Sequence, residues 1–280
     1  MTIARVFPSR TRLTPTDHLA FVNCPPPLLA LPEIDEVHVS VTFSWDMARA
    51  EQLAEAWRAV GVPVKLGGPA FNKPGGEFIS GQYLKPGAVI TSRGCPKNCW
   101  YCGVPRREGK TREYPIVDGS NVLDDNLLAC SDTHIRAVFE MLARQSERPI
   151  FTGGLEAEFL KPWQAEALHA LHPRRMYFAY DTPDDRDPLF KAGRILRDAG
   201  FTFEAHVLCC YCLIGYQGDT FERAEKRLTD IIRAGFMPYA MLYRNESGAY
   251  SLEWRRFQRE WLRPEIVATK ANDIRRTVLL

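Results

Sequence analysis

The sequence predicts an α/β protein: a partial, open (β/α)6 barrel of parallel strands preceded by a small βαβ unit. From residue 88 onward, segments typical of strands alternate with segments of helical periodicity. No antiparallel hairpin is evident among them, and the first third of the chain has one strand–helix–strand pattern. We therefore expect an N-terminal unit with its connector at 1–85, the core at 86–250 and a helical extension at 251–280.

The N-terminal unit begins with a β-branched run at 37–43 that is typical of a buried strand. Apolar residues at helical spacing follow over 44–61, and Gly61 stands where a helix would end. The segment 62–70 returns as a second strand, which predicts a parallel pair. A connector rich in proline and glycine, 69–87, leads into the core.

The core contains six segments that we expect to form strands and several that we expect to form the helices between them. The expected strands are 88–92, 121–128, 149–154, 175–181, 203–215 and 237–244. The clearest expected helices are 131–145, 187–200 and 218–235. Asp187 is the predicted N-cap of the second helix, and Asp219 and Glu222 form a predicted capping box in the third. The last 30 residues also have a helical pattern.

Composition narrows the class of protein. The net charge is +2, from 36 basic and 34 acidic side chains, so bulk electrostatics favour neither nucleic acid nor acidic membranes. The sequence has no signal-peptide pattern and no apolar run near the ~18 residues that would span a bilayer. We therefore expect a cytoplasmic protein with no membrane partner, whose eight cysteines are thiols or metal ligands rather than disulfides.

The segment 90–109 contains Cys95, Cys99 and Cys102 in the spacing C-x3-C-x2-C. It follows the first core strand, at the end of the barrel where such folds carry their chemistry. Three thiolates on one loop can bind zinc, but a zinc site normally takes a fourth ligand from a second knuckle, and none is visible nearby. A four-iron cluster uses four cysteines, so three would leave one iron open to a substrate or cofactor.

This motif, with Tyr101 before the last cysteine, resembles the C-x3-C-x-aromatic-C signature of the radical S-adenosylmethionine (SAM) superfamily. The resemblance extends over the strand before the loop and the β/α units after it. It implies that the three cysteines hold a 4Fe–4S cluster and that SAM chelates the open iron. It also implies that one electron cleaves SAM to methionine and a 5′-deoxyadenosyl radical, which abstracts hydrogen from a substrate. Tyr101 would lie against the adenine.

The chain is most similar to the cobalamin-binding-domain-containing and methylthiotransferase-like branch, with a shortened N-terminal domain. Because the D-x-H-x-x-G cobalamin signature is absent, we expect no cobalamin and interpret the N-terminal unit as a structural remnant. The resemblance implies a small-molecule, peptide or nucleotide substrate and an electron donor such as flavodoxin or ferredoxin. Two alternatives stay open: an RNA-modifying methylthiotransferase-like enzyme, and a non-catalytic zinc or iron–sulfur binding module.

Members of the superfamily hold the SAM amino group with a glycine/acidic motif at the end of the second strand. Here "TGGLE" ends the third expected strand, and the second carries Asp124, Asp125 and Asn126 instead. Neighbouring strand residues face opposite ways, so only one of the two aspartates can point toward the cofactor unless the strand has already ended. A plain turn is the alternative for this segment. The expected cofactor-binding residues are Tyr101, Asp125, Asn126, Gly153, Gly154, Glu156 and Asp181.

Two further features leave alternatives open. The basic segment 103–112 could screen SAM or bind an anionic substrate, or it could be a solvated charge run. In the fifth expected strand, alternation puts Cys210 and Cys212 on one face and Cys209 on the other. If that pair faces the barrel interior, its thiols are catalytic candidates that could donate hydrogen, receive a radical or bind a second cluster. The favoured alternative is that cysteine here is a small buried apolar residue.

Overall fold

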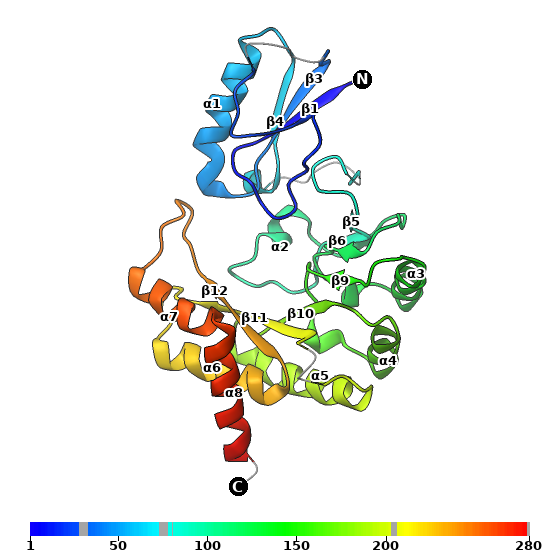
Figure 1. The fold of residues 1–280 in the computed structure, drawn as a ribbon, viewed down its shortest axis with the longest axis vertical. Helices are drawn as coiled ribbons and strands as arrows, with labels where there is room; N and C mark the ends of the chain where they lie inside the picture. Colours follow the sequence, from blue (N-terminus) through cyan, green and yellow to red (C-terminus); the bar gives the residue numbers. More distant parts are fainter. Residues whose placement is uncertain (28–32, 73–77, 80, 203–205, 279–280) are drawn as a thin grey trace.

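The computed structural model describes residues 1–27, 33–72, 78–79, 81–202 and 206–278. Over these residues the chain is an α/β protein with two parallel sheets. Figure 1 shows the N-terminal sheet and its helix at one end of the molecule, and the larger sheet with its helices at the other. The segment that carries the three cysteines lies between them.

The N-terminal sheet has four strands in the order β2-β1-β3-β4, all parallel. They are β1 (Ile3–Phe7), β2 (Ala20–Val22), β3 (Glu36–Ser40) and β4 (Val64–Gly67). The helix α1 (Met47–Arg58) connects β3 to β4 and buries Leu53 and Trp57 against the sheet. The predicted strand–helix–strand pattern is therefore present, but β1 and β2 were missed, and the unit is larger than its sequence pattern indicates.

The larger sheet contains the six core strands in sequence order, β5-β8-β9-β10-β11-β12, and every neighbouring pair is parallel. The strands are β5 (Ala88–Val89), β8 (Asn121–Val122), β9 (Ile150–Phe151), β10 (Arg175–Ala179), β11 (Leu208–Ile214) and β12 (Met237–Leu242). The expected six-strand parallel series is confirmed, although residues 203–205 of the fifth expected strand lie outside the described residues. Their parallel direction brings all six carboxyl ends to one edge, where ligands bind in folds of this kind.

Helices cover one face of this sheet (Figure 1). They are α3 (Asp132–Ala143), α4 (Pro162–Ala170), α5 (Arg186–Asp198) and α6 (Phe221–Ala234). Their apolar sides and the strand residues facing them form one continuous core that includes Phe178, Leu196 and Leu228, all fully buried. Two further helices, α7 (Leu252–Leu262) and α8 (Pro264–Val278), pack beside β12 and α6 and confirm the helical C-terminal extension.

The expectation that the core lacks an antiparallel hairpin was wrong. The strands β6 (Ser92–Arg93) and β7 (Arg112–Glu113) pair antiparallel and close the base of the cysteine segment, which also contains the short helix α2 (Val104–Arg107). The second expected strand was also too long. It ends at Val122, after which residues 123–126 form a loop and Leu127–Ala129 a 3-10 turn.

Two predicted helix caps were wrong. The N-cap of α6 is Thr220, whose hydroxyl accepts a hydrogen bond from the backbone N–H of Arg223. Asp219 instead accepts bonds from Arg227 and the backbone of Gly215, because a buried guanidinium requires a charged partner. Asp187 lies inside α5, which begins one residue earlier. No helix in the described part of the chain is long and apolar enough to cross a membrane.

Candidate functional site

The cysteine loop is held closed at its base. Its two arms meet where the N–H of Cys95 donates to the Gly109 carbonyl at 3.1 Å, next to the β6–β7 pair. Gly94 has φ +92°, and a Cβ there would overlap the Lys110 carbonyl, so only glycine fits this position. The loop therefore leaves the edge of the sheet as an anchored structure.

The three cysteines lie half-buried on this loop. Asn126 donates from Nδ2 to Cys95 Sγ at 3.3 Å, and the N–H of Val104 donates to Cys102 Sγ at 3.5 Å. Burial raises the pKa of the Cys99 and Cys102 thiols, and the neighbouring thiols add to that shift. Uncompensated thiolates are thus disfavoured here, and bound iron or zinc would stabilise them.

The loop after β8 directs its two aspartates to different surroundings, although the strand has ended before them. Asp124 is buried and accepts hydrogen bonds from the Thr91 backbone, the Thr91 hydroxyl and the Ser92 hydroxyl at 2.6–2.7 Å. Asp125 points toward the cysteine loop, where it accepts from the Gly94 N–H at 2.9 Å. Its carboxylate also lies 3.5 Å from Arg93 and 3.8 Å from Arg107. Asp125 therefore anchors the start of the cysteine loop.

In the described part of the chain, the side-chain amide of Asn126 has a hydrogen-bond partner for its nitrogen but none for its oxygen. Its Nδ2 contacts Cys95, whereas its buried Oδ1 has no hydrogen-bond partner among the described residues. A buried carbonyl oxygen without a donor is costly, so its presence beside the cysteines indicates a position for a ligand donor.

The glycine motif after β9 lies against the β8 loop. A Cβ on Gly153 would stand 2.6 Å from the Asp124 backbone nitrogen, so the two loops pack too closely for a side chain. Gly154 has φ +106° and open space where its Cβ would be. Glu156 points to the cysteine loop, and its carboxylate lies 3.4 Å from Lys97 Nζ.

Lys97, between the first two cysteines, was not singled out in the sequence. Its ammonium also contacts Asp185, just before α5, at 3.3 Å and the more exposed Glu158 at 3.4 Å. Burial opposes its charged form, but attraction to Glu156 and Asp185 prevails and raises the pKa of Lys97. These contacts join the cysteine loop to the β9 and β10 ends, and Glu156 is paired with protein rather than free.

Tyr101 and Asp181 meet at the end of β10. The Tyr101 hydroxyl hydrogen-bonds Asp181, and Asp181 Oδ1 accepts from the Leu213 N–H at 2.6 Å. Burial raises the pKa of Asp181 to about 6. The neighbouring Trp100 is 55% exposed. Its ring lies edge-on to Tyr216 and tilted to Tyr243, with centroids 5.4 and 6.2 Å away.

For Cys210 and Cys212 in β11 the sequence left two alternatives, thiols that face the barrel interior and are catalytic candidates, or small buried apolar residues. Both side chains are fully buried in the core under the helices, on the same face as Phe178. The opposite face carries Tyr211, which stacks on Tyr177 at 4.6 Å. The two thiols therefore pack against helices, as the apolar alternative predicted.

A second cysteine environment lies behind the motif loop. Among the described residues, the group of ligand atoms within 4.8 Å of one another is Asp124, Cys130 and His134 rather than the motif cysteines. His134 contacts the Thr91 hydroxyl at 3.1 Å, so Asp124, Thr91 and His134 form a connected polar network. Asp124, Cys130 and His134 are close in sequence, and Thr91 joins them from just after the first core strand.

The wider separation of the motif thiols bears on the kind of metal. Tetrahedral zinc would hold its sulfurs about 3.8 Å apart, given Zn–S bonds near 2.3 Å. The motif cysteines do not form a group within 4.8 Å. An iron–sulfur cluster binds each thiolate to a different iron and so accepts wider spacing. Two further observations fit a thiolate-bound cluster with a ligand beside it. N–H groups donate hydrogen bonds to the sulfurs of Cys95 and Cys102, and the Asn126 oxygen has no partner among the described residues.

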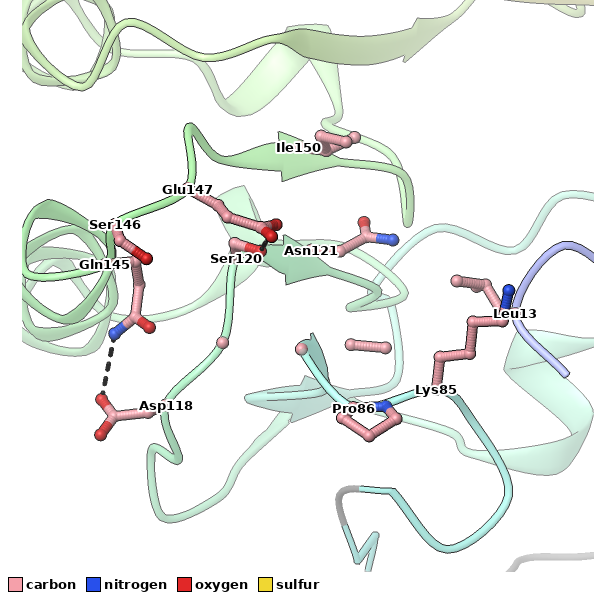
Figure 2. A pocket seen from close by; sticks show the side chains of 13 residues that line it. Leu13, Lys85, Pro86, Asp118, Ser120, Asn121, Gln145, Ser146, Glu147 and Ile150 are labelled. Atoms are coloured by element: carbon pink, nitrogen blue, oxygen red, sulfur yellow. Dashed lines mark hydrogen bonds between the residues drawn. The ribbon is translucent and has the colours of Figure 1, made fainter. Parts of the chain in front are cut away.

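A cavity of about 500 Å³ lies at the amino ends of β5, β8 and β9 (Figure 2). Two hydrogen bonds link polar side chains that line it, one from Ser120 to Glu147 and one from Gln145 to Asp118. Because the cysteines lie at the carboxyl ends of the same strands, this cavity belongs to the opposite edge of the sheet. We assign it no part in the candidate site.

The sequence matches no model of a known protein family, and a search of curated proteins finds no similar sequence. The function is therefore inferred from the cysteine motif and the contacts around it.

Proposed function

We propose that this protein is a radical SAM enzyme whose Cys95, Cys99 and Cys102 hold a 4Fe–4S cluster. The observation that carries the proposal is the contact of the cysteine loop with three successive strand ends. Asn126 follows β8 and bonds Cys95, Glu156 follows β9 and pairs with Lys97, and Asp181 follows β10 and bonds Tyr101. Three thiolates and surrounding polar groups at one edge of a parallel sheet suit a cluster with one open iron.

We also propose that the six-stranded sheet is curved into a partial (β/α)6 barrel. The sequential strand order and the helices on one face support this arrangement. The face without helices would then be the barrel interior. It carries Tyr177, Tyr211 and Tyr239, whose rings contact one another. This aromatic surface would bind a small-molecule, peptide or nucleotide substrate.

When bound, the cluster would supply the electron that cleaves SAM to methionine and a 5′-deoxyadenosyl radical. The residues of the chain have positioning roles. The unpaired Asn126 oxygen is an acceptor for the SAM amino group, and Gly154 leaves room for the cofactor. Asp125 holds the loop through Gly94. Tyr101 and Asp181 hold each other beside the adenine position that the motif implies.

Anaerobic reconstitution with iron and sulfide tests the proposal. We expect about four irons and four sulfides per chain and, after reduction, formation of 5′-deoxyadenosine from SAM. Adding SAM should change the electron paramagnetic resonance signal of the reduced cluster. The Asn126→Ala protein should keep its iron but require at least about tenfold more SAM for that change. Zinc bound in preference to iron, or a cluster signal indifferent to SAM, would contradict the proposal.

A further inference from the structure

The N-terminal sheet has a topological switch point. From β1 the chain moves to β2 on one side, and later from β3 to β4 on the other, so the direction reverses between β1 and β3. In open parallel sheets, ligands bind in the crevice outside the carboxyl ends of the strands at this reversal. The order β2-β1-β3-β4 matches the beginning of the doubly wound order 2-1-3-4-5.

A cavity of about 690 Å³ lies at this point. The carboxyl ends of three N-terminal strands line one side of it: Phe7 of β1, Ser40 of β3 and Gly67 of β4. Arg93 and Arg107, from the segment that carries the cysteines, line another side. Its volume lies within the range of about 300–1,000 Å³ that is typical of small-molecule sites.

The chemistry of the lining favours an anion with a planar ring. Three hydroxyls come from the loop directly after β1: those of Thr11 and Thr14, 3.0 Å apart, and that of Ser9, which donates to Asp46 at 2.6 Å. Three cationic side chains line the cavity together with Glu108. Lys65 pairs with Glu36 at 2.8 Å, and Arg93 and Arg107 lie 3.5 and 3.8 Å from Asp125, so a bound anion would share these cations with carboxylates of the protein. Hydroxyls, backbone N–H groups and guanidiniums are the groups that bind phosphate.

Aromatic side chains line the same cavity and supply surfaces for stacking. Phe7, Phe71 and Tyr114 come from three different segments of the chain. His38 and Tyr83 also line the wall, where His38 Nδ1 bonds the Tyr83 hydroxyl at 2.6 Å and Nε2 bonds Glu36 at 3.1 Å. A flat ring system of nucleotide size would thus meet both apolar and hydrogen-bonding groups.

We propose that this cavity binds a phosphorylated planar heterocycle, of the size of a mononucleotide. The hydroxyl-rich loop after β1 receives the phosphate, and the aromatic walls receive the ring. The N-terminal unit is then a ligand-binding unit rather than a structural remnant. This proposal does not depend on the cluster, because the site stands on the N-terminal sheet and needs no bound metal.

Isothermal titration calorimetry of the full-length protein tests it, with flavin mononucleotide and adenosine monophosphate as probes. We expect at least one of them to bind with one molecule per chain. Its dephosphorylated counterpart, riboflavin or adenosine, should bind at least about tenfold more weakly. The probe that binds identifies the ring class. If neither phosphorylated probe binds, or if phosphate makes no difference, the proposal is wrong.

Two variants locate the binding. Gly67 lines the cavity and has open space where its Cβ would be, so Gly67→Phe fills the cavity while Gly67→Ala is its matched control. We expect the phenylalanine variant to lose binding and the alanine variant to keep it, with thermal unfolding confirming that both fold. Thr11→Val should weaken the phosphorylated probe at least about fivefold and leave its dephosphorylated counterpart unchanged. Wild-type affinity in both Gly67→Phe and Thr11→Val would place the ligand elsewhere and overturn the proposal.

Discussion

Replacing Asp181 by asparagine should remove a pH-dependent loss of stability. The carboxyl lies buried at the end of β10, where it accepts the Leu213 N–H and the Tyr101 hydroxyl. Burial raises its pKa to about 6 from the ordinary value of 3.8. Asparagine keeps the acceptor oxygen for Leu213 and carries no charge at any pH, so the variant isolates the cost of ionising this group.

The magnitude follows from linkage. Because the folded-state pKa is raised, the folded protein binds more protons than the unfolded chain between pH 4 and 6. The stabilising contribution of this group is therefore present below about pH 4 and is lost as pH rises through about 6. A shift of about two units corresponds to about 3 kcal/mol. The Asp181→Asn protein should gain up to that amount over wild type between pH 4 and pH 7.

Urea unfolding of both proteins across pH 4–8, in the cluster-free state, measures this difference. The control is Asp187→Asn, since the Asp187 side chain is 88% exposed. We expect the control to follow the wild-type pH dependence throughout. If the difference between Asp181→Asn and wild type stays constant with pH, the carboxyl is ionised in the folded state at its ordinary pKa, and the reasoning about its burial is refuted.

Three further substitutions test the packing around the site. Cys210→Ala should lower the free energy of unfolding, measured in urea, by about 1 kcal/mol and leave the iron content unchanged, because the thiol only fills the core. A loss of iron would instead indicate that Cys210 binds a metal. Gly153→Ala should lower the free energy of unfolding by about 1–3 kcal/mol, because the added methyl group overlaps the β8 loop. The control Gly67→Ala should lower it little. Equal effects of the two substitutions would refute the close packing inferred at the β9 loop. Lys97→Met should cost about 1–3 kcal/mol at pH 8. The cost should shrink as the pH falls and Glu156, whose pKa is raised by burial, takes up a proton; a pH-independent cost would contradict that coupling.

The parallel core could be predicted because its signals are local. Each strand–helix unit has its own periodicity, so the six strands and their order were evident from the sequence. Short elements carry too little pattern to detect. The strands β6 and β7 have two residues each and form only because residues 92–93 and 112–113 meet across the cysteine loop. The strand β2 has three residues and pairs with β1 across the connection formed by residues 8–19, which has no strand or helix of its own.

The site was predictable where residue type alone limits the chemistry. The three cysteines were singled out by their spacing. Asp125, rather than Asp124, points toward the loop as expected, but strand alternation is not the cause, because β8 ends at Val122 before both of them. The partners of those residues come from distant segments. Lys97 reaches Asp185 across 88 positions, and no local pattern indicates such a contact. The alternation of side chains along a strand predicted that Cys210 and Cys212 share one face of β11. It does not predict which face the helices cover.

Formation of 5′-deoxyadenosine by the reconstituted, reduced protein tests the central claim most directly. We predict SAM cleavage by wild type and by Cys24→Ala, whose substituted thiol lies outside the motif. The Cys99→Ala protein should produce at least about a hundredfold less, because it lacks one of the three thiolates that bind the cluster. A wild-type protein that carries a full cluster yet cleaves no SAM, or a Cys99→Ala protein that cleaves it as fast as wild type, would contradict the account.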